Sequence, residues 1–415
     1  MKSWKHAVVA LSAAMTLTLP AWGDPAGSGA RLAQASKGAP SGALQVSVWY
    51  SLAPAEASVF QRLLNEYDQK NPYVEIEGKN FPSSATLYRE LTSGSVHPTM
   101  ALMETSWLPV VQARGQLMPL EQWMPKEQFL FNWSVKGNNY IPLWNAVQVG
   151  GVQMAMPFCY TTRALIYNPE VLQTAGVKFA PATWEQVAQA AQKISQSGAG
   201  IGFTLAANAS PEHLCRNLQV MCWQSGGDLA TSHGISPSLE GANKALAYLQ
   251  DLTVTKKAAM ADPTSPDGVG MMIGTVEDYL SLRARGVNVR TAAIPGLDKS
   301  KRTTEAQVWA LGMFAVDPAQ LYKVRDVAFY ILDFQQQLKW AEETPYLAAH
   351  VKVFDNPFYR QARLADHNNL RVFVNVLGSA RMVDTSGNAR PTLERLGKQL
   401  PSVIKGEKSA QEVLK

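Results

Sequence analysis

The sequence predicts an α/β protein of two lobes, each a sheet flanked by helices. Strand and helix patterns alternate over residues 45–114, which is typical of a parallel or mixed sheet. A second α/β unit begins near residue 163, and strand patterns return at 269–274, 289–296 and 308–316. Because strands lie on both sides of a long helical middle, we expect more than one crossover between the lobes.

The first unit opens with a strand at 45–50 and a helix at 54–70. Pro54 suits the first turn of this helix, and Asn71 with Pro72 ends it. The apolar residues at helical spacing are Val59, Phe60, Leu63, Leu64 and Tyr67. Strands are predicted at 73–77 and 99–104, and helices at 84–94 and 108–114.

Ligands of such sheets bind outside the carboxyl ends of the strands. Two strand ends meet that rule, at residues 49–51 and 104–106. Side chains alternate along a strand, so we expect Trp49 to pack in the core and Tyr50 to face the cleft. Glu104 ends an apolar strand abruptly, and its carboxylate is the best polar candidate to bind ligand hydroxyls. We expect it to lie at the edge of a loop, so that its removal has little effect on folding.

In the second unit, helices are predicted at 183–195 and 212–223, and a helix-rich tail begins at residue 319. Trp184 and Trp223 are predicted to pack their helices against the rest of the protein. Cys215 and Cys222 lie two turns apart, about 10.5 Å of rise, which is too far for a disulfide. Together with Cys159 they are predicted to be buried free thiols.

The first 23 residues have the pattern of a cleaved secretory signal peptide. Lys2 and Lys5 precede an apolar run that ends before Ala21-Trp22-Gly23. Residues 24–43 are rich in small residues and predict a flexible leader. We therefore expect a periplasmic location.

Composition excludes several classes of protein. Without the signal peptide the chain has 36 Lys and Arg against 33 Asp and Glu, and no run of five basic residues, so no nucleic-acid partner is expected. No later segment has the length of a transmembrane helix. Neither CxxC nor HExxH spacing occurs, and we expect no metal, no cofactor and a monomer.

Seven stretches resemble, in order, the carbohydrate-type solute-binding proteins of ABC importers, which include the maltose- and glycerol-3-phosphate-binding proteins. The stretches are VSVWYS, NPYVEIE, ARGQLMPLEQWM, MPFCYTTRALIYNPEVLQTAGVKFAPATWEQVAQAAQKI, VGMMIGTVEDY, AAIPG and VRDVAFYILDFQQQLKWAEETPYLAAH. The resemblance implies a two-lobed periplasmic-binding-protein fold whose ligand cleft lies between lobes joined by several hinge crossovers. It also implies membrane permease subunits as partners, and lobes of 44–158 plus 275–318 and of 159–274 plus 319–415.

The residues resemble most the glycerol-3-phosphate-binding branch. Its strand-end pattern falls on 48–51, with Tyr50 in place of a His, and Phe81 keeps an aromatic ring but lacks the hydroxyl. The branch's paired Trp residues are absent, and Asn208, Ser210 and His213 stand there instead. Its phosphate-binding Arg falls on Ser386, with Arg381 and Arg390 nearby, so a glycerophosphate ligand is in doubt. The resulting candidate ligand-binding residues are Tyr50, Ser51, Phe81, Glu104, Tyr160, Thr161, Gly274, Thr275, Trp309, Tyr346 and Arg390.

These patterns favour a non-enzymatic protein that captures a sugar, polyol or glycerophosphate-like solute. Residues 273–278, with Gly274, are a candidate hinge. Two alternatives stay open. One is a secreted carbohydrate-active hydrolase that uses Glu104 with Glu277 or Asp278 as paired carboxylates. The other is a ligand-presenting partner of a sensor kinase.

Overall fold

A computed structural model describes residues 42–124, 137–207, 209–261, 263, 268–297 and 302–414. The predicted signal peptide, nearly all of the predicted leader and Asn208 lie outside the described residues. No helix within the described ranges has both the length and the apolar character needed to cross a bilayer.

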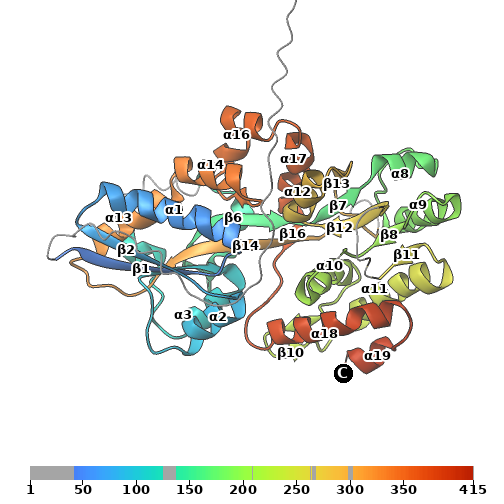
Figure 1. The fold of residues 1–415 in the computed structure, drawn as a ribbon. Coiled ribbons are helices and arrows are strands. Elements are labelled where there is room, and N and C mark those ends of the chain that lie inside the picture. Colours follow the sequence, from blue (N-terminus) through green and yellow to red (C-terminus); the bar gives the residue numbers. More distant parts are fainter. Residues whose placement is uncertain are drawn as a thin grey trace, which may run out of the picture. The chain divides into compact units, whose positions relative to one another are not determined.

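The first sheet is mixed, as the sequence predicts, with the strand order β15-β6-β14-β3-β1-β2 and with β16 beside β14 (Figure 1). Strand β1 pairs in parallel with β2 and β3, whereas β14 runs antiparallel to β3 and β6. The strands are β1 (Leu44–Tyr50), β2 (Val74–Asn80), β3 (Met100–Glu104), β6 (Met156–Thr162), β14 (Thr304–Met313), β15 (Leu347–Ala348) and β16 (Ala380–Arg381).

Helices cover both faces of this sheet, and we call the sheet with these helices the first lobe. Its helices are α1 (Pro54–Lys70), α2 (Ser84–Ser93), α3 (Leu108–Gln112), α4 (Leu120–Trp123), α7 (Ile141–Ala146), α13 (Leu321–Leu332) and α14 (Phe334–Glu343), with a 3-10 turn η1 at Thr105–Trp107. One core cluster joins β1, α1, α13 and α14, and another joins the opposite face of β1 to α2 and α3. Both faces of β1 are therefore packed.

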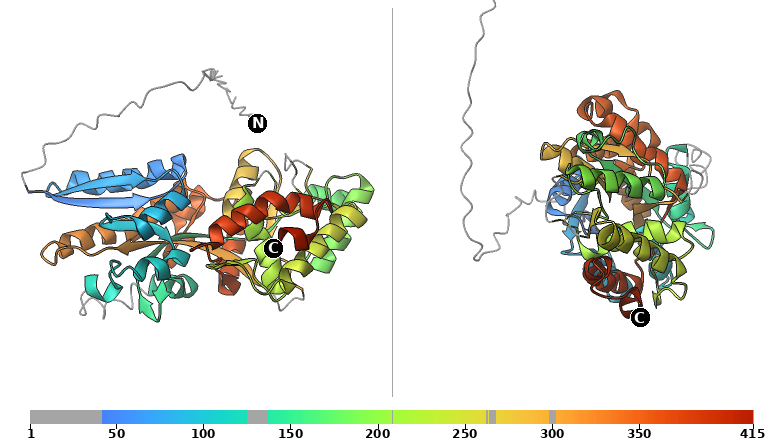
Figure 2. Two further views of the ribbon diagram at one scale, coloured as in Figure 1. Left: turned by 90° about the horizontal axis from the view of Figure 1, so that it is seen from below. Right: turned by 90° about the vertical axis from the view of Figure 1, so that its right-hand side faces the viewer.

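The second sheet has the order β11-β8-β12-β7-β13 and forms the second lobe with its helices. Its strands are β7 (Ala164–Tyr167), β8 (Phe203–Thr204), β11 (Ala259–Met260), β12 (Met271–Gly274) and β13 (Arg290–Ala292). Its helices are α8 (Pro169–Thr174), α9 (Trp184–Ser197), α10 (Pro211–Gln224), α11 (Glu240–Gln250), α12 (Val276–Ala284), α18 (Ala389–Ile404) and α19 (Ala410–Val413). Helix α18 packs against α10, and Figure 2 shows the red helix against the green and yellow helices of this lobe.

Smaller elements complete the described ranges. Two short ladders pair β4 (Gln148–Val149) with β5 (Val152–Gln153) and β9 (Ala230–Thr231) with β10 (Gly234–Ile235). A π-helical turn, η2 (Asp251–Thr255), follows α11, and a 3-10 turn, η3 (Val376–Ser379), precedes β16. Helices α15 (Val351–Phe354), α16 (Pro357–Ala362) and α17 (His367–Asn375) contribute to a core cluster that includes residues of both sheets.

In the described part of the chain, the order of the strands gives three connections between the lobes. The first is Arg163 alone, between β6 and β7; the second runs from β13 to β14; the third runs from β16 to α18. The expected boundaries differ from this arrangement in both directions. Helix α12 and strand β13 lie in the second lobe rather than the first, and α13, α14, β15 and β16 lie in the first lobe rather than the second.

The predicted helix at 212–223 is confirmed as α10, and the three cysteines are free and buried. Burial raises the pKa of the Cys222 thiol well above its ordinary value, so this group is held in its neutral form. Trp184 and Trp223 belong to the core of the second lobe, as the sequence predicts.

Candidate functional site

A cavity of about 490 Å³ lies where the carboxyl ends of β1 and β3 meet the first turns of α10, α12 and α18. Eight of the predicted site residues line it: Ser51, Phe81, Glu104, Thr161, Thr275, Trp309, Tyr346 and Arg390. Ser210 and His213, which stand where the related branch has paired Trp residues, also line it. The strand-end rule thus locates the cavity correctly.

Tyr50 does not line the cavity, so the expectation that it faces the cleft is wrong. Its side chain is only 2% exposed and packs edge-on against Phe60 at 4.8 Å between ring centroids. Its hydroxyl donates to Gln61 Oε1 at 2.8 Å, and burial raises its pKa to about 12. Trp49 packs against Phe81 in the other core cluster, as predicted. Because helices cover both faces of the sheet, alternation directs each ring into a core.

Tyr160 and Gly274 also lie outside the cavity lining. Tyr160 is fully buried and meets Tyr140 edge-on at 5.8 Å. Gly274 is the last residue of β12, paired with Ala164 inside the second sheet, and a Cβ there would lie 2.5 Å from Ile166 Cδ1. The absence of a side chain at Gly274 thus allows close packing within the second lobe. The predicted hinge at 273–278 is therefore misplaced, because the crossovers lie elsewhere.

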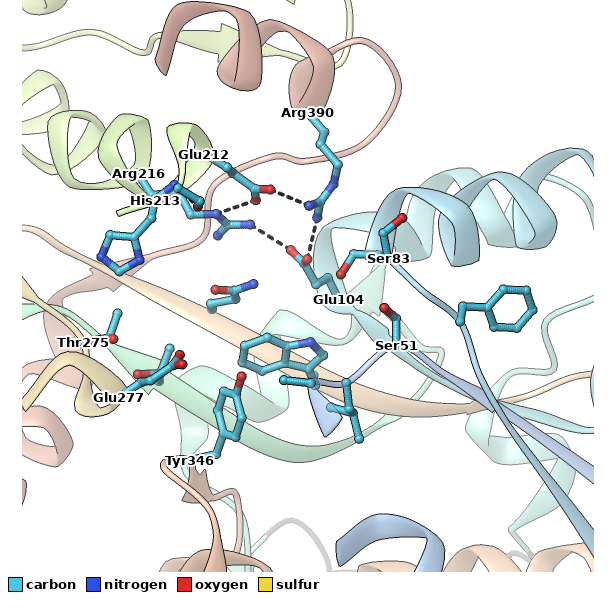
Figure 3. Close-up of a pocket in the computed structure, with 18 of the residues that line it drawn as sticks. Ser51, Ser83, Glu104, Glu212, His213, Arg216, Thr275, Glu277, Tyr346 and Arg390 are labelled. Carbon is cyan, nitrogen blue, oxygen red and sulfur yellow. Dashed lines mark hydrogen bonds and ion pairs between the residues drawn. The ribbon is translucent and has the colours of Figure 1, made fainter. Parts of the chain in front are cut away.

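Glu104 is held by two arginines from the second lobe (Figure 3). Arg216 on α10 donates from Nη2 to Glu104 Oε2 at 2.9 Å, and Arg390 on α18 donates from Nη2 to Glu104 Oε1 at 2.5 Å. Thr385 Oγ1, in the third connection, donates to Oε2 at 3.1 Å. Glu104 is only 4% exposed. Both of its carboxylate oxygens thus accept hydrogen bonds from other residues of the protein.

Three further ionised groups complete this charge network. Glu212 accepts from both arginines, at 2.9 Å from Arg216 Nε and 2.5 Å from Arg390 Nη1. Glu305, at the start of β14, pairs with Arg216 and with Arg163. Three carboxylates therefore face three guanidinium groups, and the network has no formal net charge.

These contacts overturn the expectation that Glu104 is a loop-edge carboxylate with little effect on folding. Burial alone would raise the pKa of Glu104, but the charges of Arg390 and Arg216 and their hydrogen bonds lower it. The group is therefore ionised, and its charge is balanced by arginines of the other lobe.

An aromatic wall forms another side of the cavity. The rings of Trp309 and Tyr346 meet edge-on at 4.9 Å between centroids, and Tyr346 stacks on the buried Trp340 at 6.0 Å. The neighbour Trp340 fixes the position of Tyr346 from behind. Tyr346 thus presents a rigid, partly exposed ring to the cavity.

The first turn of α12 carries a second polar group of the site. Thr275 caps this helix and accepts from the Asp278 backbone N–H, while the Asp278 carboxylate accepts from Thr275. His213 Nε2 lies 3.2 Å from Asp278 Oδ2. Although burial alone would raise the pKa of Asp278, the charge of His213 and these hydrogen bonds lower it to about 2.

Asp278→Asn is expected to cost about 2 kcal/mol of unfolding free energy at neutral pH. The carboxylate has a lower pKa in the folded chain, so its contribution is present above about pH 4 and is lost as the pH falls towards about 2. Urea unfolding across this range should show that the difference in unfolding free energy between wild type and variant becomes smaller at acid pH. A constant difference at every pH would contradict the charge pairing, and Glu121→Gln, at an exposed position, serves as the control.

Sequence reasoning missed Arg163, Glu212 and Arg216. Arg216 lies in a stretch of α10 that is buried throughout, from Leu214 to Gln224, and a buried arginine needs an acidic partner. Because Asn217 follows it directly, the sequence pattern alone does not mark it. Arg381 and Ser386, near the expected phosphate-binding position, do not line the cavity. Within the described ranges, no group of three or more His, Cys, Asp or Glu residues is arranged to hold a metal ion.

Comparisons with known proteins agree with this architecture. The family model described as bacterial extracellular solute-binding protein matches residues 53–274, more than half of the chain. A Brucella abortus protein named as a binding protein is 23% identical over 297 residues, which is 68% of this chain and 69% of that protein.

Two solved structures share the fold. The cyclic alpha-maltosyl-1,6-maltose binding protein of Arthrobacter globiformis is 22% identical with a TM-score of 0.70, covering 90% of this chain and 96% of its own. UgpB of Mycobacterium tuberculosis, in complex with glycerophosphocholine, is 15% identical, also with a TM-score of 0.70 and the same coverage.

Proposed function

This chain belongs to the bacterial extracellular solute-binding proteins, and from that premise we propose that its cavity captures a small carbohydrate or polyol for the permease subunits of an ABC importer. The main observation in support of this proposal is the aromatic wall of Trp309 and Tyr346, in a cavity that also exposes hydroxyl, amide and charged groups. The predicted signal peptide supports a periplasmic location for this role.

A sugar matches these two kinds of surface. Its apolar C–H face covers an aromatic ring, and its hydroxyls need convergent polar partners. Ser51, Asn80, Ser83 and Gln307 line the cavity and can serve these hydroxyls. The volume, about 490 Å³, is within the range of small-molecule sites. The ligands named for the two similar structures, a cyclic maltosyl-maltose and glycerophosphocholine, are consistent with this class.

We propose binding rather than hydrolysis. A glycosidase needs one carboxylic acid with a raised pKa to protonate the leaving group. Arg390 and Arg216 lower the pKa of Glu104, and its two oxygens are occupied. Glu277 has a raised pKa, but its partner would be Glu104, whose oxygens are engaged by Arg216, Arg390 and Thr385. Glu104 is therefore poorly suited to act as the nucleophile or base of such a pair.

The test is a thermal-shift and calorimetric screen of glucose, maltose, cellobiose, glycerol and glycerol 3-phosphate, with product analysis of every mixture. A ligand at about 100 times its Kd should add about 2.7 kcal/mol to the unfolding free energy. Saturable binding of a sugar or polyol without turnover is the expected result. Absence of binding throughout the panel, or release of a cleavage product, would contradict the proposal.

A further inference from the structure

The charges that line the cavity are unevenly balanced. On one side, Glu104 and Glu212 are neutralised by Arg216 and Arg390. Figure 3 shows Glu277, Thr275 and Tyr346 on the other side of the cavity from this network. Within the described part of the chain, no ion pair or hydrogen bond is made to the Glu277 carboxylate. One wall of the cavity is therefore neutral, and the other carries an uncompensated acid.

Glu56 adds a second negative group near this wall. It lies in the first turn of α1, just after the lining residue Pro54, and is only 8% exposed. Its Oε2 atom has no hydrogen-bond partner among the described residues. The charge of Glu56 acts on both Glu277 and Tyr346, so the three groups share one electrostatic environment. Glu56 is not among the residues that line the cavity, so it contributes to this wall through its charge.

The groups around Glu277 do not neutralise it fully. They are Asp278 on α12, Glu56 on α1, His213 on α10 and Tyr346 after α14. His213 is the one basic group among these four, and it lies against Asp278 at 3.2 Å. Although Glu277 is exposed, partial desolvation and then the charges of Asp278 and Glu56 raise its pKa against the opposing effect of His213. A cation placed here would relieve the repulsion among these carboxylates.

We propose that the solute carries an ammonium group, which binds between the Glu277 carboxylate and the rings of Trp309 and Tyr346. This inference rests on the proposed function, because it assigns a substituent to the solute of the same cavity. Aromatic faces attract cations, and a carboxylate forms strong charge-assisted hydrogen bonds with an ammonium group. The ligand class is thus an amino sugar or a comparable amine-bearing polyol, and the hydroxyls of its skeleton remain for Ser51 and the amide groups of the cavity.

The test compares, on each of two sugar skeletons, a hydroxyl, an amino and an acetamido substituent, of which only the amino group is charged. The probes are cellobiose, its 2,2′-diamino analogue and the corresponding diacetylated sugar, together with glucose, glucosamine and N-acetylglucosamine. Calorimetry at about pH 6 should show the amines binding about ten- to a hundredfold more tightly than their hydroxyl and acetamido counterparts. Glu277→Gln should weaken binding of the amines by a larger factor than binding of the neutral sugars, and so abolish the preference, whereas Glu407→Gln, at an exposed position outside the cavity lining, should leave the preference intact.

The pH dependence provides an independent readout. As the pH falls through the raised pKa of Glu277, the preference for the amines should shrink, because the protonated carboxyl no longer attracts a cation. Equal or weaker binding of the amines, with the neutral sugars bound, would overturn this inference and leave the proposed function standing. Failure of all six sugars to bind would overturn this inference, and absence of binding by maltose, glycerol and glycerol 3-phosphate as well would overturn both.

Discussion

Glu104→Ala is expected to lower the unfolding free energy of the ligand-free protein by about 3–5 kcal/mol, as removal of one partner from a buried ion pair does. The substitution leaves Arg216 and Arg390 facing each other without the carboxylate that both contact. Thr385 also loses an acceptor. Urea unfolding followed by tryptophan fluorescence measures the effect.

Glu104→Gln provides the informative comparison. An amide retains one acceptor oxygen but removes the negative charge. The loss of unfolding free energy in Glu104→Gln should therefore be smaller than in Glu104→Ala and larger than for a surface substitution. Glu121→Ala, at an exposed position of α4, should change the unfolding free energy by less than about 0.5 kcal/mol. If Glu104→Ala unfolds like this control, the charge network contributes nothing to the ligand-free fold.

Tyr346→Ala is expected to weaken sugar binding by about 30-fold or more, the loss of about 2 kcal/mol that is typical of an aromatic residue at the centre of a binding site. The substitution removes the ring that faces the cavity and that Trp309 and Trp340 hold in place. Calorimetry with the sugar of the panel that binds most tightly measures this loss of affinity. Circular dichroism establishes that the variant is folded.

Tyr346→Phe separates the ring from its hydroxyl. If the apolar face of the sugar lies on the ring, this variant should retain most of the affinity. Tyr322→Ala, at an exposed position of α13, should bind like the wild type. Unchanged affinity in folded Tyr346→Ala would show that the aromatic wall is not part of the binding surface.

Local pattern predicted the elements well. The apolar spacing of residues 59–67 specifies the buried face of α1, and Thr183 marks the start of α9. These features depend on interactions within a few residues, such as capping and periodic burial. The order of these elements was sufficient to predict two α/β lobes with several crossovers, and the family match supports it.

The side to which a strand-end residue points was not predictable in the same way. Alternation placed Trp49 and Tyr50 on opposite faces, but helices cover both faces of the sheet, so neither ring reaches the cavity. Gly274 was predicted to be a hinge, whereas the close approach of Ile166 explains the glycine. Both outcomes depend on neighbours that are distant in the sequence.

The sequence by itself determined the fold class, the strand ends that border the cavity, the three free thiols and the family resemblance. Only the tertiary structure decided what Glu104 does, because its partners Arg216 and Arg390 lie 112 and 286 residues away. It also decided that Glu277, unlike Glu104, has no ion-pair partner among the described residues. The physical reason is that the ionisation and availability of a carboxylate depend on burial and on charges within a few ångströms, and folding alone brings those charges together.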